Sequence, residues 1–315
     1  MDIYKRLKLA CLGAVLLTFF ITAEAVAGGG SLVSAPWLAQ NMHKANVVVL
    51  DVSDFTHYEV SHIPGAVKAF GPWMTMNDNF VGFMMPKIPA LVRMIKSYGV
   101  NNNSTVIIYG AGVSADDTAR SARALWTFEA LGHNNVAILN GGFAGWVQQG
   151  GAVSNRPVTP DNGNFSGRLV AGKLATLVGV RKELDNHQVV FVDNRMPDHF
   201  FGKEKNSEIA RFGHIPGARL WPAPYMTNAG VALSPSYIKD VKVLRQMAAG
   251  VGIPADKNAE IITYSDHGRS AAMGYFVLHD MLGYNNVKVY DGSILQYAAV
   301  SRMPMARYSL WYQAH

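Results

Sequence analysis

The chain has almost no cysteine, and its single cysteine lies in a segment typical of an export signal. Cys11 falls within an uncharged apolar stretch, residues 9–23, which follows a basic start and precedes an Ala25-Val26-Ala27 motif. These are the three parts of a secretory signal peptide, so we expect residues 1–27 to be removed by cleavage after Ala27. Disulfide bonds, cysteine-based metal sites and thiol chemistry are then excluded from the mature protein.

Long hydrophobic runs are missing as well. The apolar part of the signal is shorter than the roughly 20 residues that a membrane-spanning helix needs. We therefore predict a periplasmic or secreted protein. Membrane association remains only as the alternative in which the signal stays uncleaved and acts as an anchor.

Charge is sparse and only mildly unbalanced. Charged residues make up 16% of the chain and the formal net charge is +6. The signal holds three basic and two acidic residues, so the mature chain keeps +6 − (3 − 2) = +5. No cluster of Lys and Arg accompanies this surplus, which argues against a nucleic-acid partner and favours a small anionic ligand.

The chain repeats itself at a spacing of about 150 residues. Residues 62–66 (HIPGA) recur at 214–218, and residues 131–136 (LGHNNV) recur at 282–287 as LGYNNV. Two matched blocks in the same order indicate two copies of one domain. We place the copies at residues 31–150 and 168–310. They are joined by a linker at 151–167, which is rich in Gly, Pro, Asn, Asp and Ser and has no hydrophobic period.

Each copy alternates short apolar runs with helical patterns. The predicted strands are residues 47–50, 106–109 and 136–139 in the first copy and 189–192, 261–264 and 287–290 in the second. The predicted helices include residues 119–130, residues 271–282 and one that opens at Ser234-Pro235 and runs through Met247. Strands separated by helices indicate an α/β fold, with a central parallel sheet covered by helices on both faces in each copy.

Together these blocks resemble the tandem-domain rhodanese family, the thiosulfate and 3-mercaptopyruvate sulfurtransferases. The resemblance rests on Asp51, residues 62–66, Leu131-Gly132-His133, Asn140-Gly141-Gly142 and Trp146 in the first copy, and on Asp193-Asn194-Arg195, residues 214–218, Leu282-Gly283-Tyr284 and Asp291-Gly292 in the second. It covers nearly all of the mature chain. It implies two rhodanese-like domains, with the loop at 265–270 facing the cleft between them.

The resemblance places the reactive position on a serine. In that family a cysteine follows a central strand of the second domain and carries the transferred sulfur as a persulfide, helped by backbone amides and a helix N-terminus. Here the strand at 261–264 is followed by Ser265, and the loop Ser265-Asp266-His267-Gly268-Arg269-Ser270 keeps the family's length and its glycine in fourth place. A serine hydroxyl cannot form a persulfide, and it needs a neighbouring base to act as a nucleophile. His267 is disfavoured as that base, because loop amides aimed at residue 265 direct its side chain outward.

The same resemblance suggests where a ligand would bind. The arginine that usually holds an anionic substrate has its place at His199 or Phe201, while the family role of Arg195 is mainly structural. Arg269 is the better anion candidate, with a plain solvated side chain as its alternative. The predicted ligand-binding set is therefore Asp266, His267, Gly268, Arg269, Ser270, His199 and Arg195, around the degenerate nucleophile position Ser265.

Other conspicuous residues favour structural roles. The first copy has no nucleophile at Gly110, and we expect Asp116 or Asp117 to cap the helix that follows. His62 and His214 are expected to be hydrogen-bonded turn residues. The pairs at Met74 and Met76 and at Met84 and Met85 admit a copper(I) site as an alternative to core packing, and the aromatics Trp126, Phe128, Tyr275 and Phe276 are predicted core residues. We predict no metal and no cofactor.

Three functions remain open. The leading hypothesis is an exported binding protein for a small sulfur- or selenium-containing anion, such as thiosulfate or sulfite, held at the 265–270 loop without persulfide chemistry. The second is residual sulfurtransferase activity. The third is an interaction module for an exported protein partner.

Overall fold

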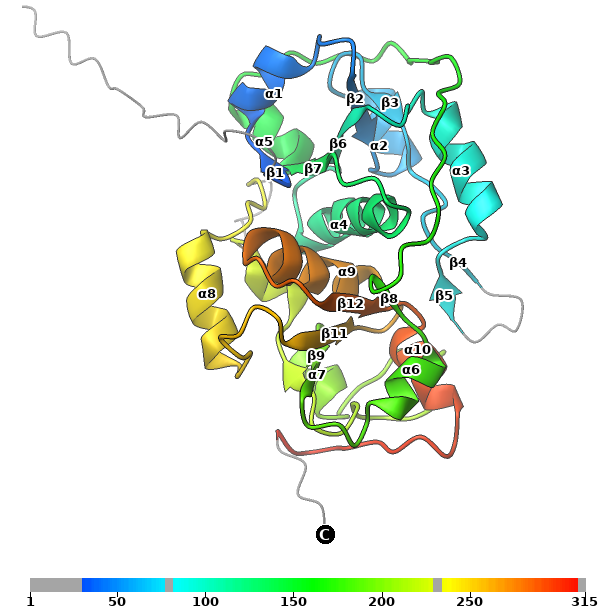
Figure 1. The fold of residues 1–315 in the computed structure, drawn as a ribbon. Helices are drawn as coiled ribbons and strands as arrows, with labels where there is room; N and C mark the ends of the chain where they lie inside the picture. The colour runs from blue at the N-terminus through cyan, green and yellow to red at the C-terminus, as the bar shows by residue number, and fades with distance from the viewer. Residues whose placement is uncertain (1–29, 77–81, 229–233, 311–315) are drawn as a thin grey trace, which may run out of the picture.

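Two similar α/β units make up the protein (Figure 1). The structure is a computed structural model that describes residues 30–76, 82–228 and 234–310, so the predicted signal peptide lies outside the described residues. None of the helices within these three ranges is long and apolar enough to cross a membrane.

Each unit is built on a five-stranded parallel sheet, and the two sheets have equivalent strand orders. The first runs β1 (Leu32–Val33), β7 (Val136–Leu139), β6 (Thr105–Tyr109), β2 (Val47–Asp51) and β3 (Val67–Lys68). The second runs β8 (Leu174–Ala175), β12 (Val287–Tyr290), β11 (Glu260–Tyr264), β9 (Val189–Asp193) and β10 (Arg219–Leu220). Every strand has its counterpart at the same place, which is what a duplicated domain requires.

Helices connect the strands. In the first unit they are α1 (Ala35–Asn41), α2 (Phe55–Val60), α3 (Ile88–Ser97), α4 (Ala115–Ala130) and α5 (Gly142–Gln148), with a small hairpin of β4 (Thr75–Met76) and β5 (Phe83–Met84). In the second they are α6 (Leu177–Lys182), α7 (Pro197–Phe200), the 3-10 turn η1 (Ala223–Met226), α8 (Val241–Gly250), α9 (Arg269–Phe276) with its π-helical continuation η2 (Val277–Met281), and α10 (Ser293–Ala299). These bounds confirm the predicted α/β fold.

Alternate residues of the central strands pack on opposite faces of the first sheet. Ile108 belongs to the same buried cluster as residues of α3 and α4, whereas Ile107 and Tyr109 pack with residues of α1 and α5. Side chains of a strand point to opposite faces in turn, so a strand covered on both sides is apolar throughout. This explains why the central strands read as continuous apolar runs in the sequence.

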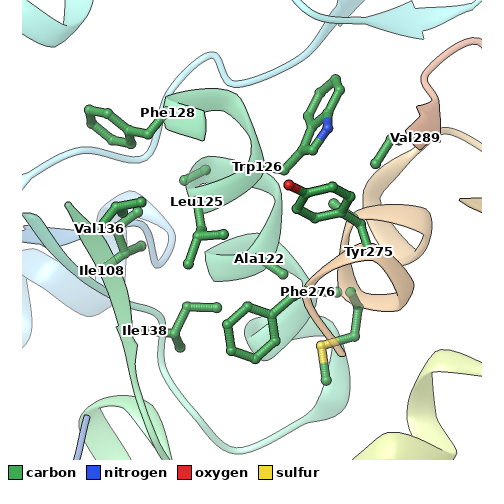
Figure 2. Packing of buried hydrophobic residues seen from close by; sticks show 14 of the residues in the cluster. Ile108, Ala122, Leu125, Trp126, Phe128, Val136, Ile138, Tyr275, Phe276 and Val289 are labelled. Atoms are coloured by element: carbon green, nitrogen blue, oxygen red, sulfur yellow. The ribbon is translucent and has the colours of Figure 1, made fainter. Parts of the chain in front are cut away.

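The two units pack against each other through α4 and α9 (Figure 1). Figure 2 shows Trp126 of α4 beside Tyr275 of α9, and shows Leu125 of α4 and Phe276 of α9 on the side of Ile138 of the first sheet. All four side chains are fully buried and belong to one cluster that continues into both sheets. The predicted core role of these aromatics is confirmed, and the core does not stop at the boundary between the units.

The repeated HIPGA turns fix the ends of the central strands. The amide of Ile215 donates to the hydroxyl of Tyr264 at 3.2 Å, as the amide of Ile63 does to Tyr109 at 3.1 Å. The turn histidines are buried, and His214 donates through Nδ1 to a backbone carbonyl at 2.8 Å. Burial lowers the pKa of His214. The predicted structural role of the histidines is confirmed. The turn that begins at His214 also holds Tyr264, the strand residue before Ser265, through the amide of Ile215.

The prediction of a helix opening at Ser234-Pro235 is wrong, because α8 begins at Val241. The segment before it extends along the first unit instead. Ser236 donates its amide to the carbonyl of Gly112 at 2.7 Å, and Ile238 donates to the side-chain oxygen of Asn140 at 2.9 Å. These contacts with the other unit outweigh the local Ser-Pro helix signal.

The chain between α5 and β8 is extended and fastened to the first unit. The backbone amide of Gly163 donates to the carbonyl of Lys96 at 2.8 Å, and that of Phe165 donates to the carbonyl of Val100 at 3.1 Å. Phe165 is buried against Phe128. The segment between the repeats is therefore part of the packed structure.

Candidate functional site

The loop between β11 and α9 borders a cavity of about 510 Å³ between the two units. Its lining residues are Met74, Phe83 and Asp116 from the first unit and Glu208, Ser265, Asp266, His267, Arg269 and Ser270 from the second. The loop follows the carboxyl end of a central parallel strand, where ligands of α/β proteins usually bind. The fold thus brings most of the predicted loop residues to one cleft.

Ser265 is held inside the loop by backbone amides. Its side chain is buried, with 2% of the residue exposed, and Oγ accepts hydrogen bonds from the amides of Gly268 and Ala271 at 3.1 and 3.2 Å. Its own amide donates to Ser293 Oγ at 3.1 Å. In the described part of the chain, no side chain accepts a hydrogen bond from Ser265 Oγ. The hydroxyl therefore lies where amide donors converge, without a base to activate it.

Gly268 is required by the backbone of this loop. It precedes α9 with φ of +81°, in the left-handed region that favours glycine. A Cβ atom here would lie 2.8 Å from the carbonyl oxygen of Asp291 and 3.0 Å from Nη1 of Arg123. The carboxylate of Asp291 is buried, bonds to Arg123 of the other unit and accepts the amide of Met85 at 2.6 Å. The loop thus rests on an ion pair that joins the two units.

Each charged side chain of the loop faces an opposite charge or a histidine. The pairs are Asp266 with His199 at 3.1 Å, His267 with Glu208 at 2.8 Å and Arg269 with Asp116 at 3.1 Å. The third pair crosses between the units and is partly exposed, with 34% of the Arg269 side chain accessible. A hydrogen bond from its own amide, and then one from His267, lower the pKa of Glu208. The loop's side-chain charges are therefore largely used within the protein.

His267 is directed away from Ser265. Its ring meets the ring of Phe83 edge-on at 5.4 Å, and its Nε2 bonds to Glu208. The geometry shows no Ser265–His267 hydrogen bond among the described residues, in line with the outward direction expected from the sequence.

Arg195 and His199 lie behind the cavity. Arg195 is buried and donates through Nε and Nη2 to Asp193 and through Nη2 to the carbonyl of Gly213. Burial by itself lowers the pKa of Arg195, but Asp193 more than offsets this and holds that pKa above its ordinary value. Arg195 Nη1 also lies 3.7 Å from Asp266. Arg195 and His199 thus contact the loop through Asp266, and neither lines the cavity, a correction to their expected place at the ligand.

Backbone amides of the loop are further donors at the cavity. Among the described residues, the amides of Asp266, His267, Arg269 and Ser270 have no hydrogen-bond acceptor. Successive free amides at the start of a helix form a concave site suited to an anion. The residues that carry these amides all line the cavity.

The corresponding loop of the first unit is closed by backbone packing. A Cβ at Gly112 would lie 2.0 Å from the carbonyl oxygen of Gly141, so the two glycine turns touch directly. The residue that caps α4 is Ser114, not Asp116 or Asp117 as predicted. Asp117 does complete a capping box, because its carboxylate accepts the amide of Ser114 at 3.0 Å. Asp116 takes no part in this cap, and its carboxylate bonds to Arg120 and to Arg269, each at 3.1 Å.

Three lining residues were not predicted to lie at this site. Met74 precedes β4, Phe83 begins β5 and Glu208 lies in a turn after α7, and only the folded chain brings them to the cavity. Met74 belongs to a segment with a copper(I) alternative, yet the structure places it beside carboxylates and Arg269. Contacts this distant in sequence have no local pattern from which they can be read.

Side chains of the types that bind metals come together at a different place, in the interface between the units. Glu129, His279 and Asp280 lie close enough to share an ion. The ammonium of Lys173 lies 2.8 Å from Nε2 of His279 and 3.5 Å from the Glu129 carboxylate, so a cation of the protein already occupies this group. Burial, and then Glu129, raise the pKa of Asp280 well above its usual value.

The protein has two fused α/β units, and its strand–loop–helix site faces the cleft between them. This architecture defines the class of tandem-domain proteins in which the second domain carries the reactive loop. The chain belongs to the rhodanese-like domain family. The sequence profile of the rhodanese-like domain matches this chain twice, at residues 34–149 and at residues 176–299. The family suggested by the repeats and the loop is confirmed.

Similar proteins extend over almost the whole chain. A protein of Mycobacterium bovis named "Putative thiosulfate sulfurtransferase 1" is 30% identical over 291 residues, covering 87% of this chain and 96% of its own. The sulfur carrier protein TtuD of Thermus thermophilus is 28% identical over 295 residues, covering 88% and 96%.

Solved structures share the fold. SseA from Escherichia coli, described as a 3-mercaptopyruvate sulfotransferase with the rhodanese fold, superimposes with a TM-score of 0.67 at 23% identity and covers 84% of this chain and 98% of its own. The anaerobic ergothioneine biosynthesis enzyme of Chlorobium limicola gives a TM-score of 0.75 at 19% identity, covering 88% and 70%.

Proposed function

We propose that this protein is an exported member of the sulfurtransferase family that binds a small sulfur- or selenium-containing oxyanion at the 265–270 loop and forms no persulfide. One observation carries the proposal. The hydroxyl of Ser265 accepts two loop amides at the nucleophile position, while four further amides around it have no acceptor among the described residues. The loop keeps its anion-binding frame and has lost its thiol.

The chemistry of Ser265 supports the absence of a covalent step. A serine oxygen cannot hold a sulfane sulfur, and its high pKa makes it a nucleophile only beside a general base. His267, the histidine within the loop, bonds to Glu208 instead. The thiolate mechanism of a reactive cysteine depends on a pKa far lower than that of an alcohol.

The charges around the cavity set the expected strength of binding. The lining holds three carboxylates, Asp116, Glu208 and Asp266, against the single guanidinium of Arg269. Their partners reduce the repulsion, but an anion still competes with Asp116 for Arg269. We therefore expect weak binding, with a dissociation constant on the order of 1 mM, equivalent to about 4 kcal/mol.

Calorimetry with thiosulfate, sulfite, sulfate and selenite tests the proposal. We expect Arg269→Ala to weaken binding about tenfold, equivalent to ~1.4 kcal/mol. Asp116→Asn should strengthen binding severalfold, because it releases Arg269 from its partner. Arg181→Ala, an exposed arginine on α6, is the matched control and should change nothing. Absence of binding to the wild type, or undiminished binding by Arg269→Ala, would contradict the proposal.

Residual sulfurtransferase activity is the competing enzyme function. A thiosulfate-to-cyanide assay on the wild type beside Ser265→Cys separates the two. Activity in the mutant alone supports a working scaffold without its nucleophile. Activity already present in the wild type would overturn the proposal of a binding protein.

Export and partners are tested on the natural protein. Cleavage after Ala27 predicts a mature N-terminus at Gly28 in the periplasmic or secreted fraction, and an intact N-terminus in the membrane fraction would show an uncleaved anchor. A protein that co-purifies with the mature chain, is lost on surface mutation and is unaffected by Arg269→Ala would favour the interaction module over the anion-binding protein.

A further inference from the structure

A second, smaller cavity lies on the first unit beside the loop cavity. Its volume is about 150 Å³, and its lining residues are Val52, Phe70, Pro72, Trp73, Met74, Arg120, Arg123 and Arg269. Met74 and Arg269 also line the loop cavity, so the two spaces adjoin. Val52 directly follows β2, a central strand of the first sheet. The cavity thus lies at the carboxyl edge of a sheet, the usual edge for ligands in α/β folds.

A buried guanidinium with an unused donor lies at this cavity. Arg123 of α4 is only 1% exposed. Its Nε donates to the carbonyl of Trp73 at 3.3 Å and its Nη1 bonds to Asp291, but Nη2 has no hydrogen-bond partner among the described residues. Buried polar groups without partners are rare in folded proteins, and this donor belongs to a residue of the cavity wall, where a ligand could accept its hydrogen bond.

The charge of the lining indicates an anion. Three arginines and no carboxylate line the cavity. The carboxylates that face these arginines lie outside the lining, since Asp116 bonds to Arg120 and Arg269, each at 3.1 Å, and Asp291 bonds to Arg123. Each arginine therefore keeps N–H groups that no carboxylate uses.

The remaining wall indicates an apolar body on that anion. Val52 and Trp73 are almost fully buried, and Phe70, Pro72 and Met74 complete an apolar and aromatic surface. An inorganic oxyanion would leave this surface uncovered. An apolar cavity of ~150 Å³ is large enough for benzene, so the body has about six heavy atoms or fewer.

We propose that this cavity binds a small monocarboxylate with a hydrocarbon body of about four to six carbon atoms. The carboxylate accepts from Nη2 of Arg123, with Arg120 and Arg269 adding charge, and the body packs between Val52 and Trp73. This cavity adjoins the loop cavity and shares Met74 and Arg269 with it, but its ligand is different from the oxyanion proposed for the 265–270 loop.

Benzoate and valerate are the probes, with benzamide as the neutral control. We expect millimolar or tighter binding of both carboxylates by calorimetry and at least tenfold weaker binding of benzamide. A change in tryptophan fluorescence should accompany binding and be lost in Trp73→Phe. No benzoate binding at 10 mM, or equal binding of benzamide, would overturn the proposal.

Variants locate the site. Arg123→Gln should weaken benzoate binding more than tenfold, but it breaks a buried ion pair, so its thermal unfolding is measured in parallel. Arg120→Ala changes a partly exposed side chain and should weaken binding about threefold whether or not Arg123→Gln folds. Arg181→Ala is the matched control. Unchanged affinity in Arg120→Ala together with a fluorescence signal that survives in Trp73→Phe would place the ligand elsewhere.

A loop variant separates this proposal from the proposed function. Ser270→Glu puts a negative charge among the free amides of the loop, so it should abolish thiosulfate binding and leave benzoate binding within twofold. If the wild type binds benzoate but not thiosulfate, the loop proposal fails and the carboxylate site stands. Loss of both ligands in Ser270→Glu would show a single shared site.

Discussion

Replacing Ser265 by cysteine should create an acidic thiol, and the size of the effect follows from the loop geometry. Oγ of Ser265 accepts amides at 3.1 Å from Gly268 and 3.2 Å from Ala271, and the loop leads into the N-terminus of α9. A sulfur atom in the same place would meet the same two donors. These donors stabilise a thiolate more than a thiol.

The magnitude is the balance of opposing contributions. A hydrogen bond to a charged acceptor is worth about 1 kcal/mol more than one to a neutral acceptor, so two amides give ~2 kcal/mol. The helix terminus adds about 0.5 kcal/mol. At 1.36 kcal/mol per unit these contributions lower the pKa from 8.5 by roughly two units. Burial and the carboxylate of Asp266 act the other way, which leaves an expected pKa of about 7.

Thiolate absorbance near 240 nm, followed against pH, measures this value in Ser265→Cys. Ser270→Cys is the matched control, because its side chain lies in the same loop but Ser270 Oγ accepts no amide among the described residues. We expect the Ser265→Cys thiol to have the lower pKa of the two. A pKa of 8.5 or above, or equal values in the two variants, would refute the convergence of loop amides on residue 265.

Three further predictions concern stability, each measured by chemical denaturation. Gly268→Ala should cost about 1–3 kcal/mol, because it puts a Cβ at positive φ against Asp291; an unchanged midpoint would contradict this. Phe276→Ala should cost about 3–5 kcal/mol, because the ring is fully buried between the units; a loss below 1 kcal/mol would contradict the continuous core. Burial raises the pKa of Asp280, so the folded state keeps this proton longer than the unfolded state. The contribution of Asp280 to the free energy of unfolding is therefore full below about pH 4. It is lost as pH rises through the folded-state pKa, by at most about 1.4 kcal/mol per pH unit. Asp280→Asn should remove this decline, and an identical pH slope in the variant would refute it.

The sheets were predictable because their strands are buried on both faces. Residues 136–139 and 287–290 were predicted as strands with the bounds that the structure has. The start of α8 was not predictable from Ser234-Pro235, because contacts of Ser236 and Ile238 with the first unit decide it. Local signals succeed where burial is uniform and fail where a distant segment supplies the hydrogen bonds.

The sequence predicted which loop forms the site, but it did not predict the ion pairs that the charged side chains of this loop make. Strand register and Gly268 located Ser265. The ion pair between Arg269 and Asp116 joins residues 153 positions apart. Nothing in the sequence around either residue predicts that the two side chains meet. Only the fold shows that the best anion candidate of the loop already has a carboxylate beside it.

The continuous core between α4 and α9 constrains how the chain folds as it is made. The first unit leaves the ribosome first, but Trp126 of α4 packs beside Tyr275 of α9, which is synthesised about 150 residues later. Until then the first unit presents an apolar helix face, the kind of surface that chaperones bind and that drives aggregation. Once α9 docks, the units share one core, so they should unfold together in a single cooperative transition.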